Sequence, residues 1–223
     1  MRRLPHLSVI VPLAPGENAH SALVPELCAQ LGADDEIVLV TTAQDHAALQ
    51  AEVQAHSQVR CVQAQAGRAR QLNAGAAAAR NPWLWFLHAD SRLTAGTVPR
   101  LLEAADEDYL GYLDLDFHDG DWTMRLTRFG TWLRCRVFGL PFGDQGFLIS
   151  KHLFCALGRY DEQLSAGEDH ALVWSARRAR IPLRPLRAAL LTSARKYRQH
   201  GWLQTTARHL LLTWRQARRF ARS

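Results

Sequence analysis

The sequence predicts one α/β domain, in which a mostly parallel β-sheet lies between layers of helices. Short apolar runs alternate with longer alanine-rich segments through the first half of the chain. These runs are apolar at nearly every position, which is typical of strands buried on both faces of a parallel sheet. The length of 223 residues is sufficient for one such domain with a substantial core.

The first half of the chain supplies four of the expected strands. They are Leu7–Val11, Glu36–Thr41, Val59–Gln63 and Trp83–Leu87. The helices expected between them are Ala19–Leu31, a segment from Asp45 as N-cap to about His56, and Arg68–Arg80. Pro12, Gly32 and Pro82 mark ends of these elements, as proline and glycine commonly do.

The second half departs from this regular alternation. The expected strands are Tyr109–Phe117 and Phe147–Ser150, and the expected helices are Thr97–Ala105, Trp122–Val137, about Gly167–Arg180 and about Gly201–Ala221. We expect residues 1–200 to form the domain and residues 201–223 to form a C-terminal basic amphipathic helix.

Charge is distributed unevenly along the chain. The net charge is +6, but all 21 Asp and Glu residues precede residue 170, whereas 13 of the 27 Lys and Arg residues follow it. An acidic body is therefore followed by a basic segment. That segment has little aromatic interleaving and no nucleic-acid recognition motif, so we expect no specific nucleic-acid partner.

Cysteine spacing and hydropathy bear on the compartment. The four cysteines lie far apart, which argues against a disulfide framework or a structural zinc site. No stretch approaches the ~20 apolar residues that cross a bilayer. We expect a cytoplasmic protein, with peripheral attachment to the cytoplasmic face of a membrane as the alternative. The sequence leaves the oligomeric state open.

The first candidate site lies at the end of the fourth expected strand. Strand alternation would place His88 and Asp90 on the same side at its carboxyl end. An imidazole and a carboxylate at this spacing can ligate a divalent cation, which in turn can neutralise a diphosphate. The alternative is that Asp90 caps the next turn and that His88 is hydrogen-bonded in the core.

The second candidate site is the start of the helix expected from Gly167. Asp169 or Glu168 can act as a general base there. The alternative is simple helix capping, because acidic residues are favoured in the first turn of a helix.

The third candidate site is cationic. Arg195 and Lys196 lie in a cluster preceded by Arg184 and Arg187, and clustered basic side chains can bind phosphate oxygens. Arg68 offers a further phosphate contact at a helix N-terminus. The alternative is a solvated basic face or a nonspecific nucleic-acid patch.

Six stretches, taken in order, resemble the family 2 glycosyltransferases of the GT-A fold. The resemblance is closest to a small subgroup whose fourth strand ends in F-L-H-A-D. The matching stretches are Leu7–Pro12, Gly67–Gly75, Trp85–Asp90, Pro141–Gly146, Gly167–Asp169 and Thr192–Arg195. They extend from about residue 7 to residue 200, so the resemblance covers most of the chain.

The resemblance implies inverting transfer of a sugar from a nucleotide-diphosphate donor to an acceptor hydroxyl, with Mg²⁺ or Mn²⁺ as cofactor. It leaves the acceptor open, with a lipid-linked acceptor as one option. The positions that match nucleotide-sugar contacts are Pro12, Glu17, Thr41, Arg68, Gln71, Asn73, His88 and Asp90. The other implied roles are base for Asp169 with Glu168 beside it, metal ligand for Asp90 and more weakly for His88, acceptor side for Gly143, Asp144 and Gln145, and diphosphate contact for Arg195 and Lys196.

One feature departs from the family pattern. Thr41 and Thr42 stand where an Asp at the end of the second strand usually helps to bind the nucleoside, and Asp45 comes too late to replace it without a rearranged loop. A noncatalytic nucleotide-sugar-binding protein on the same fold is therefore the alternative function. Asp114 and Asp116 also form a D-x-D motif, but they lie inside an alternating strand pattern, so we do not expect a metal site there.

The last expected helix has one apolar face. Its members are Leu203, Ala207, Leu210, Leu211, Trp214, Ala217 and Ala221, with Arg208, Arg215, Arg219 and Arg222 away from its centre. Docking on the acidic body is the interpretation that we favour. Contact with an anionic membrane surface is the alternative.

Overall fold

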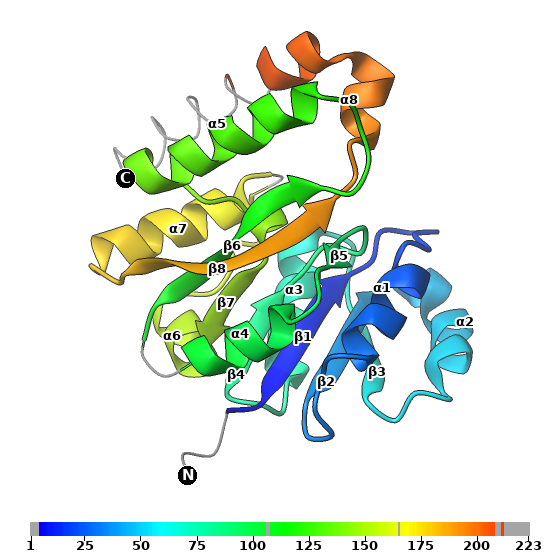
Figure 1. Cartoon of the computed structure of the whole chain (residues 1–223). Helices are drawn as coiled ribbons and strands as arrows, with labels where there is room; N and C mark the ends of the chain where they lie inside the picture. The colour runs from blue at the N-terminus through cyan, green and yellow to red at the C-terminus, as the bar shows by residue number, and fades with distance from the viewer. Residues whose placement is uncertain (1–4, 106–107, 165, 208–210, 212–223) are drawn as a thin grey trace.

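The computed structural model describes residues 5–105, 108–164, 166–207 and 211. They form a curled eight-stranded sheet that is flanked by helices (Figure 1). The strand order is β3-β2-β1-β4-β7-β6-β8-β5. The expected α/β fold with a mostly parallel sheet is therefore confirmed.

The strands combine a parallel half with a mixed half. Their bounds are β1 (Leu7–Pro12), β2 (Glu36–Thr41), β3 (Val59–Gln63), β4 (Trp83–Phe86), β5 (Arg92–Leu93), β6 (Leu110–Phe117), β7 (Phe147–Ser150) and β8 (Leu183–Thr192). Strands β3, β2, β1 and β4 pair in parallel. Strand β7 runs antiparallel to both β4 and β6, and β8 is parallel to β6.

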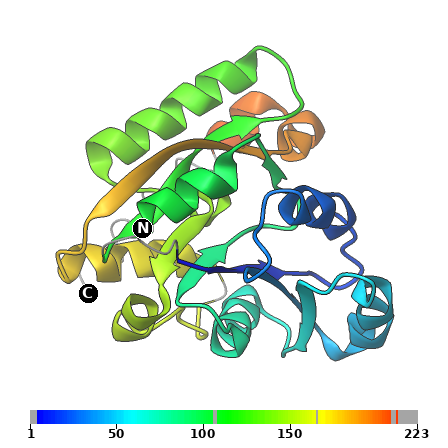
Figure 2. The same cartoon turned by 60° about the horizontal axis from the view of Figure 1, so that its bottom comes forward.

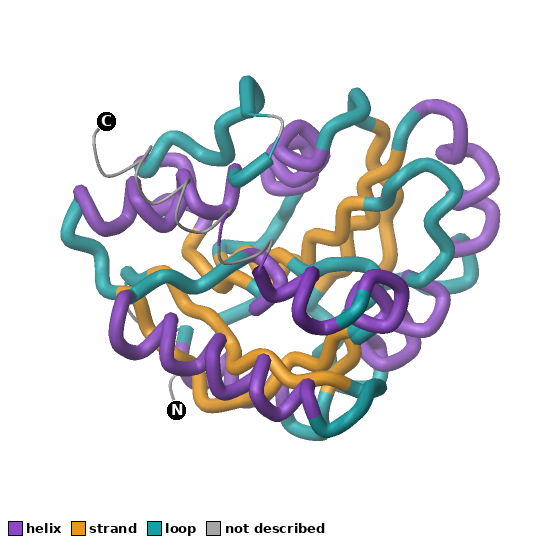
Figure 3. The backbone as a smooth tube through the Cα atoms, turned by 90° about the horizontal axis from the view of Figure 1, so that it is seen from above, coloured by secondary structure: helices purple, strands orange, loops and turns teal. Residues whose placement is uncertain are grey.

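The helices cover both faces of this sheet, as the view from above shows (Figure 3). Their bounds are α1 (His20–Cys28), α2 (Ala43–Val53), α3 (Arg68–Ala78), α4 (Thr97–Ala104), α5 (Thr123–Phe138), α6 (Lys151–Ala156), α7 (Glu168–Arg178) and α8 (Arg195–His200), with a 3-10 helix η1 (Gly143–Gln145). Residues 202–207 are also helical. The rest of the C-terminal helix expected from the sequence, apart from residue 211, lies outside the described residues, and the domain division at residue 200 remains a prediction.

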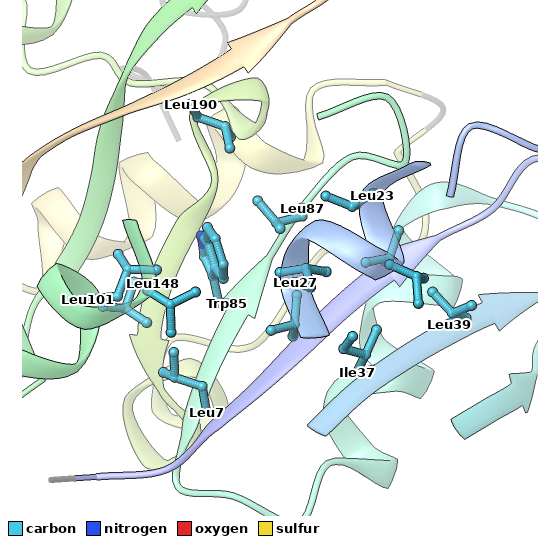
Figure 4. Packing of buried hydrophobic residues seen from close by; sticks show 14 of the residues in the cluster. Leu7, Leu23, Leu27, Ile37, Leu39, Trp85, Leu87, Leu101, Leu148 and Leu190 are labelled. Atoms are coloured by element: carbon cyan, nitrogen blue, oxygen red, sulfur yellow. The ribbon is translucent and has the colours of Figure 1, made fainter. Parts of the chain in front are cut away.

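The core consists of two apolar clusters, one on each face of the sheet. Along β1, Val9 and Val11 belong to the cluster under α1, α2 and α4, whereas Ile10 belongs to the cluster under α3, α5, α6 and α7. Figure 4 shows Trp85 of β4 in the first cluster, among Leu87, Leu148 and Leu190. Because successive side chains of a strand point to opposite faces, a strand that is apolar throughout fills both clusters.

Strand β8 is the main element that the sequence analysis missed. Arg184, Pro185 and Arg187 interrupt its apolar pattern, and proline and charge both argue against a strand. The strand nevertheless pairs with β6 over most of its length, with a register shift near Tyr112 and a positive φ of 53° at Arg187. Helices α6 and α8, strand β5 and η1 were also missed, because each is too short to show a periodic pattern.

Helix α3 packs closely against the sheet at Gly75. A Cβ at this position would overlap the Ile10 side chain and would come 2.8 Å from Cγ2 of Val40. Only glycine lets the helix approach β1 and β2 so closely. This contact fixes the height of α3 above the sheet, and α3 carries Arg68 at its first residue.

A buried carboxylate links neighbouring segments at the edge of the sheet where the parallel strands begin. Glu36, at the start of β2, accepts hydrogen bonds from Ser8 Oγ at 2.6 Å, Arg80 N at 2.5 Å and Arg60 Nε at 2.9 Å. Burial works to raise the pKa of Glu36, but the hydrogen bonds and the charge of Arg60 outweigh it and lower the pKa from its usual value.

We expect Glu36→Gln to lower the free energy of unfolding by about 1–3 kcal/mol at pH 7, because it replaces charge-assisted hydrogen bonds at a buried site. The folded-state pKa lies below the unfolded one, so this contribution is complete at neutral pH and is lost as the pH falls below about 4.5. Urea unfolding at pH 7 and pH 3.5 measures both effects. Glu103→Gln, at an exposed position of α4, is the control; an equal loss in both variants would contradict this role for Glu36.

Candidate functional site

A pocket of about 670 Å³ opens at the carboxyl ends of β1, β2 and β3. Its lining residues are Pro15, Thr42, Ala43, Gln44, Gln63, Ala64, Gln65 and Ala66. They offer amide and hydroxyl groups and no ionisable side chain. Ligands of open α/β sheets bind at this end of the strands, so the pocket is a candidate for an uncharged, hydrogen-bonding part of a ligand.

The strand ends, loops and helix start at this edge hold five residues that the sequence analysis singled out. Thr41 is buried in β2, and the next residue, Thr42, lines the pocket instead. The carboxylate of Asp45 accepts a hydrogen bond from Gly16 N at 3.1 Å and so ties the loop after β1 to the start of α2. Glu17 accepts one from Ala19 N at 2.9 Å, just before α1. Pro12 is the last residue of β1.

The N-cap residue of α2 is Thr42, three residues before the expected Asp45. Asp45 therefore lies in the first turn of α2. There its carboxylate is free to bond to the neighbouring loop, which sequence spacing alone did not indicate.

Arg68 joins three elements at the edge of the sheet. Its Nε lies 2.9 Å from Oε1 of the buried Glu168 on α7, and its Nη2 contacts Nε2 of His88 after β4. A cation at a helix N-terminus is opposed by the helix dipole, so Glu168 offsets an otherwise unfavourable charge. Arg68, His88 and Glu168 come from distant parts of the sequence, and the fold brings them together.

Asp90 does not continue the alternation that the sequence predicts. Strand β4 ends at Phe86, and Asp90 lies in a turn. His88 follows Leu84 and Phe86 at intervals of two residues, so its side chain points to the same face of the sheet, which lies under α3. This orientation explains its contact with Arg68. Within the described part of the chain, the half-buried carboxylate of Asp90 has no hydrogen-bond or ion-pair partner.

Few side chains at the candidate site could act as ligands of a divalent cation. Among the described residues, no group of three or more His, Cys, Asp or Glu side chains could hold a metal ion. His88 faces a guanidinium group, which disfavours a cation at its Nε2 in this arrangement. The Asp90 carboxylate is suitable for Mg²⁺, which proteins commonly hold with one or two carboxylates together with substrate phosphates.

Asp169 is fixed at the start of α7 by two backbone donors. Gly143 N donates to Oδ2 and His170 N donates to Oδ1, each at 2.8 Å. A Cβ at Gly143 would lie 2.9 Å from Nη2 of Arg68 and 3.0 Å from Oδ2 of Asp169. A larger residue would therefore require the Arg68 and Asp169 side chains to shift, and glycine lets the η1 turn lie against both charged groups.

The η1 turn is supported from α5 and α7. Oε1 of Gln145 accepts hydrogen bonds from Arg134 Nη2 at 3.2 Å and from Phe142 N at 3.1 Å. The Arg134 guanidinium lies 3.5 Å from the centre of the Phe142 ring, which also contacts the ring of His170. Burial, which disfavours the charged form, outweighs the attraction of Asp169 and lowers the pKa of His170 to about 4. His170 is therefore neutral at pH 7.

The amides of Gln71 and Asn73 are buried and bind protein groups. Gln71 Nε2 donates to the carbonyls of Leu13 and Val40 at 2.7 and 3.0 Å. Asn73 Nδ2 donates to Tyr160 O at 2.9 Å, and Asn73 Oδ1 accepts from Tyr160 N at 3.1 Å. These contacts position the loop after β1 and the segment that leads to α7.

The turn between β8 and α8, which precedes Arg195 and Lys196, is held by an acidic residue that the sequence analysis missed. Asp119, in the turn after β6, accepts hydrogen bonds from Ala194 N at 2.5 Å and Ser193 Oγ at 3.1 Å and pairs with Arg198 at 2.7 Å. Burial works against the charged form, but these bonds and the charges of His118 and Arg198 lower the pKa of Asp119. Arg195 is exposed at the start of α8, and Lys196 is the next residue.

A second pocket, of about 480 Å³, lies between α5, β6 and β8 beside Gln145. Its lining residues are Asp114, Leu115, Asp116, Arg125, Arg128, Phe129, Trp132, Gln145 and Ala189. Asp114 and Asp116 pair with Arg136 and Arg128 of α5 at 3.0 and 2.9 Å. The D-x-D motif on β6 thus holds α5 against the sheet.

These observations define an α/β protein whose candidate site, with its polar groups and two pockets, lies near one edge of a mixed sheet. Comparison with known proteins identifies the family. The family model of glycosyl transferase family 2 matches residues 8–161. The chain therefore belongs to glycosyl transferase family 2, and its narrower placement by the F-L-H-A-D motif stays a prediction. No curated protein matches the chain.

Solved structures of TarS from S. aureus share this GT-A fold. TarS residues 1–349 align with a TM-score of 0.65 and 15% identity over 85% of this chain and 60% of theirs. A longer TarS structure aligns with a TM-score of 0.66 and 16% identity over 84% of this chain and 36% of that one. A complex of TarS 1–349 with UDP-GlcNAc aligns with a TM-score of 0.56 and 17% identity, over 77% and 53%. The chain spans less than two thirds of each TarS chain.

We expect Asn73→Ala to lower the free energy of unfolding by about 1–3 kcal/mol without any ligand, because it leaves buried groups at Tyr160 unpaired. Gln65→Ala is the matched control, since it removes an exposed amide from the first pocket and is expected to change stability by less than about 0.5 kcal/mol. Urea denaturation measures both. Equal stabilities of Asn73→Ala and wild type would contradict a positioning role for this side chain.

Proposed function

We propose that this protein transfers a glycosyl group from a nucleoside diphosphate sugar to an acceptor hydroxyl, with inversion and with the aid of a divalent metal ion. Membership of glycosyl transferase family 2 supports the class of reaction. The arrangement of charged side chains at the carboxyl edge of the sheet supports the assignment of roles.

The position of Asp169 is the observation that carries the proposal. Two backbone N–H groups hold its carboxylate beside η1, and Gln145 of η1 lines the second pocket. In the proposed reaction, this carboxylate takes the proton of the acceptor hydroxyl, and the acceptor oxygen forms a bond to the anomeric carbon. The bond from that carbon to the diphosphate breaks, and the nucleoside diphosphate leaves with the electron pair.

Glu168 has a different role in this proposal. Its carboxylate is buried and paired with Arg68, so it orients the guanidinium and is less suited to accept a proton. Arg68, at the N-terminus of α3, offers a charge to the donor diphosphate. Arg195 and Lys196 remain candidates for contact with the leaving diphosphate, as the sequence predicts.

In this proposal, the first pocket binds the nucleoside part of the sugar donor. Thr42, Gln63 and Gln65 supply hydrogen-bonding groups for a nucleoside at the ends of β2 and β3. UDP-GlcNAc is the first donor to test, because TarS was crystallised in complex with it. Asp90 is the proposed protein ligand for Mg²⁺ or Mn²⁺, and a metal ion bound there would supply positive charge to the diphosphate.

A noncatalytic nucleotide-sugar-binding protein is the second candidate. The observation that favours it is the first pocket, which lacks the carboxylate of the usual strand-two Asp. Charge-assisted hydrogen bonds to the ribose would then be missing. Binding of a nucleotide sugar without turnover would distinguish this function from transfer.

We expect Asp169→Asn to lower kcat by about 10²–10⁴-fold, because the amide cannot accept the acceptor proton. Release of nucleoside diphosphate, measured over a panel of donors and acceptors, provides the assay. Donor affinity is expected to change little, since Asp169 is proposed to act on the acceptor.

Two matched variants test this assignment. Asp161→Asn removes an exposed acid elsewhere and is expected to leave kcat within about twofold. Glu168→Gln is expected to weaken donor binding more than it lowers kcat, because it releases Arg68. Wild-type turnover in Asp169→Asn, together with its loss in Glu168→Gln, would show that the base has been assigned to the wrong residue.

We expect Mn²⁺ to raise the thermal unfolding temperature further when a nucleoside diphosphate is present, because metal and diphosphate bind together. In Asp90→Asn this additional shift is expected to disappear, whereas His88→Gln is expected to retain part of it. Differential scanning fluorimetry with UDP and Mn²⁺ separately and combined provides the measurement. An unchanged shift in Asp90→Asn would remove Asp90 as the metal ligand.

A further inference from the structure

Helix α5 presents its more apolar face to solvent. The exposed stripe consists of Trp122, Leu126, Phe129, Leu133 and Val137, whose spacing of three to four residues places them on one side of the helix. Phe129 and Val137 are 60% and 62% exposed. We refer to these five side chains as the α5 stripe.

The opposite face of α5 is small and partly polar. Met124, Thr131 and Cys135 are the side chains that it buries, and the half-buried Thr127 accepts a hydrogen bond from Trp202 Nε1 at 2.9 Å. A helix that served only to cover the sheet would place its large apolar side chains inward. The α5 stripe therefore needs a different explanation, because contiguous exposed apolar surface commonly marks an interaction site.

Charge indicates which partner is suitable. The segment from Trp122 to Phe138 contains four arginines and no acidic residue. Arg128 and Arg136 are held by Asp116 and Asp114 on β6, while Arg125 forms no ion pair with a described residue. Aromatic and leucine side chains together with arginines are typical of helices that lie in the interface of an anionic bilayer.

The same charge pattern disfavours two other occupants. A second copy of this chain on the α5 stripe would bring the arginines of both helices together. Residues 208–223 contain five arginines and no acidic residue, so they would also add like charge. An anionic lipid surface offers both an apolar layer and the opposite charge.

We propose that the α5 stripe seats this protein on the surface of an anionic membrane, with α5 parallel to the bilayer. Figures 1 and 2 show α5 on the outside of the molecule, where it covers β6. No helix in the described ranges is long and apolar enough to cross a bilayer, and the proposed contact is peripheral.

The position of α5 also has a consequence for the acceptor, which rests on the proposed function. Arg134 of α5 holds Gln145 of η1, and Phe129 and Trp132 line the pocket beside Gln145. A protein seated by the α5 stripe would hold this pocket at the lipid surface. An acceptor that is itself embedded in the membrane would then reach Asp169 without leaving the bilayer.

Vesicle sedimentation with the full chain tests the proposal. We expect the wild type to bind vesicles of phosphatidylcholine and phosphatidylglycerol, to bind pure phosphatidylcholine weakly, and to lose affinity as salt rises. Leu126→Gln combined with Val137→Gln is expected to weaken binding about tenfold or more, because it removes two apolar side chains from the interface. Both positions are exposed, so the unfolding temperature is expected to stay within a few degrees of wild type.

Leu211→Gln combined with Trp214→Gln is the matched control in the C-terminal segment, and it is expected to retain wild-type binding within about twofold. Failure of the wild type to bind anionic vesicles would overturn the proposal. Loss of binding in the control pair with retention in the α5 pair would also overturn it. A wild-type dimer that the α5 pair converts to a monomer in sedimentation velocity would instead identify the α5 stripe as a self-association surface. None of these readouts requires sugar transfer, so the membrane proposal can fail independently of the proposed function.

Discussion

The burial of both faces of the sheet is the constraint on which the rest of the structure depends. Side chains in the middle of β1, β2 and β4 are enclosed by two apolar clusters, so charged groups can project only where strands begin or end. At one end Glu36 fastens β2 to its neighbours. At the other end, helix starts carry Arg68 and Asp169, and the segment after β4 carries His88. The same apolar pattern that specifies the fold thus concentrates the polar chemistry at one edge.

Arg68 shows how few contacts hold that edge together. One guanidinium bridges α3, the segment after β4 and α7, and it does so at a helix terminus where a positive charge is unfavourable by itself. A nearby anion offsets this charge, and Glu168 provides it. An incoming diphosphate would bind the guanidinium that Glu168 orients. Donor binding and the position of α7 are in this way physically coupled.

The sequence predicted most of the parallel half of the sheet, because strands such as Glu36–Thr41 are apolar throughout and are separated by alanine-rich helices. It missed β8, whose Arg184, Pro185 and Arg187 resemble a basic loop and whose pairing with β6 depends on partners more than 70 residues away. For the site, residue types indicated Asp169 and Arg68 but not their contacts. The roles of Asp119 and Asp45 required the fold, because hydrogen bonds to Ala194 and Gly16 leave no periodic pattern in a sequence.

The antiparallel direction of β7 determines which side of the site an insertion in the sequence can alter. Because β7 is antiparallel to β4, it starts at the edge of the sheet where β1 to β4 end. The η1 turn, which precedes β7, therefore lies at the same edge as the loops that follow β1 to β4. Loops on the two sides of the site therefore belong to different halves of the chain and to opposite ends of their strands. Insertions before β7 can reshape one side while the loops after β1, β2 and β3 keep their length. Recognition of two different ligands can in this way diversify separately on one unchanged sheet.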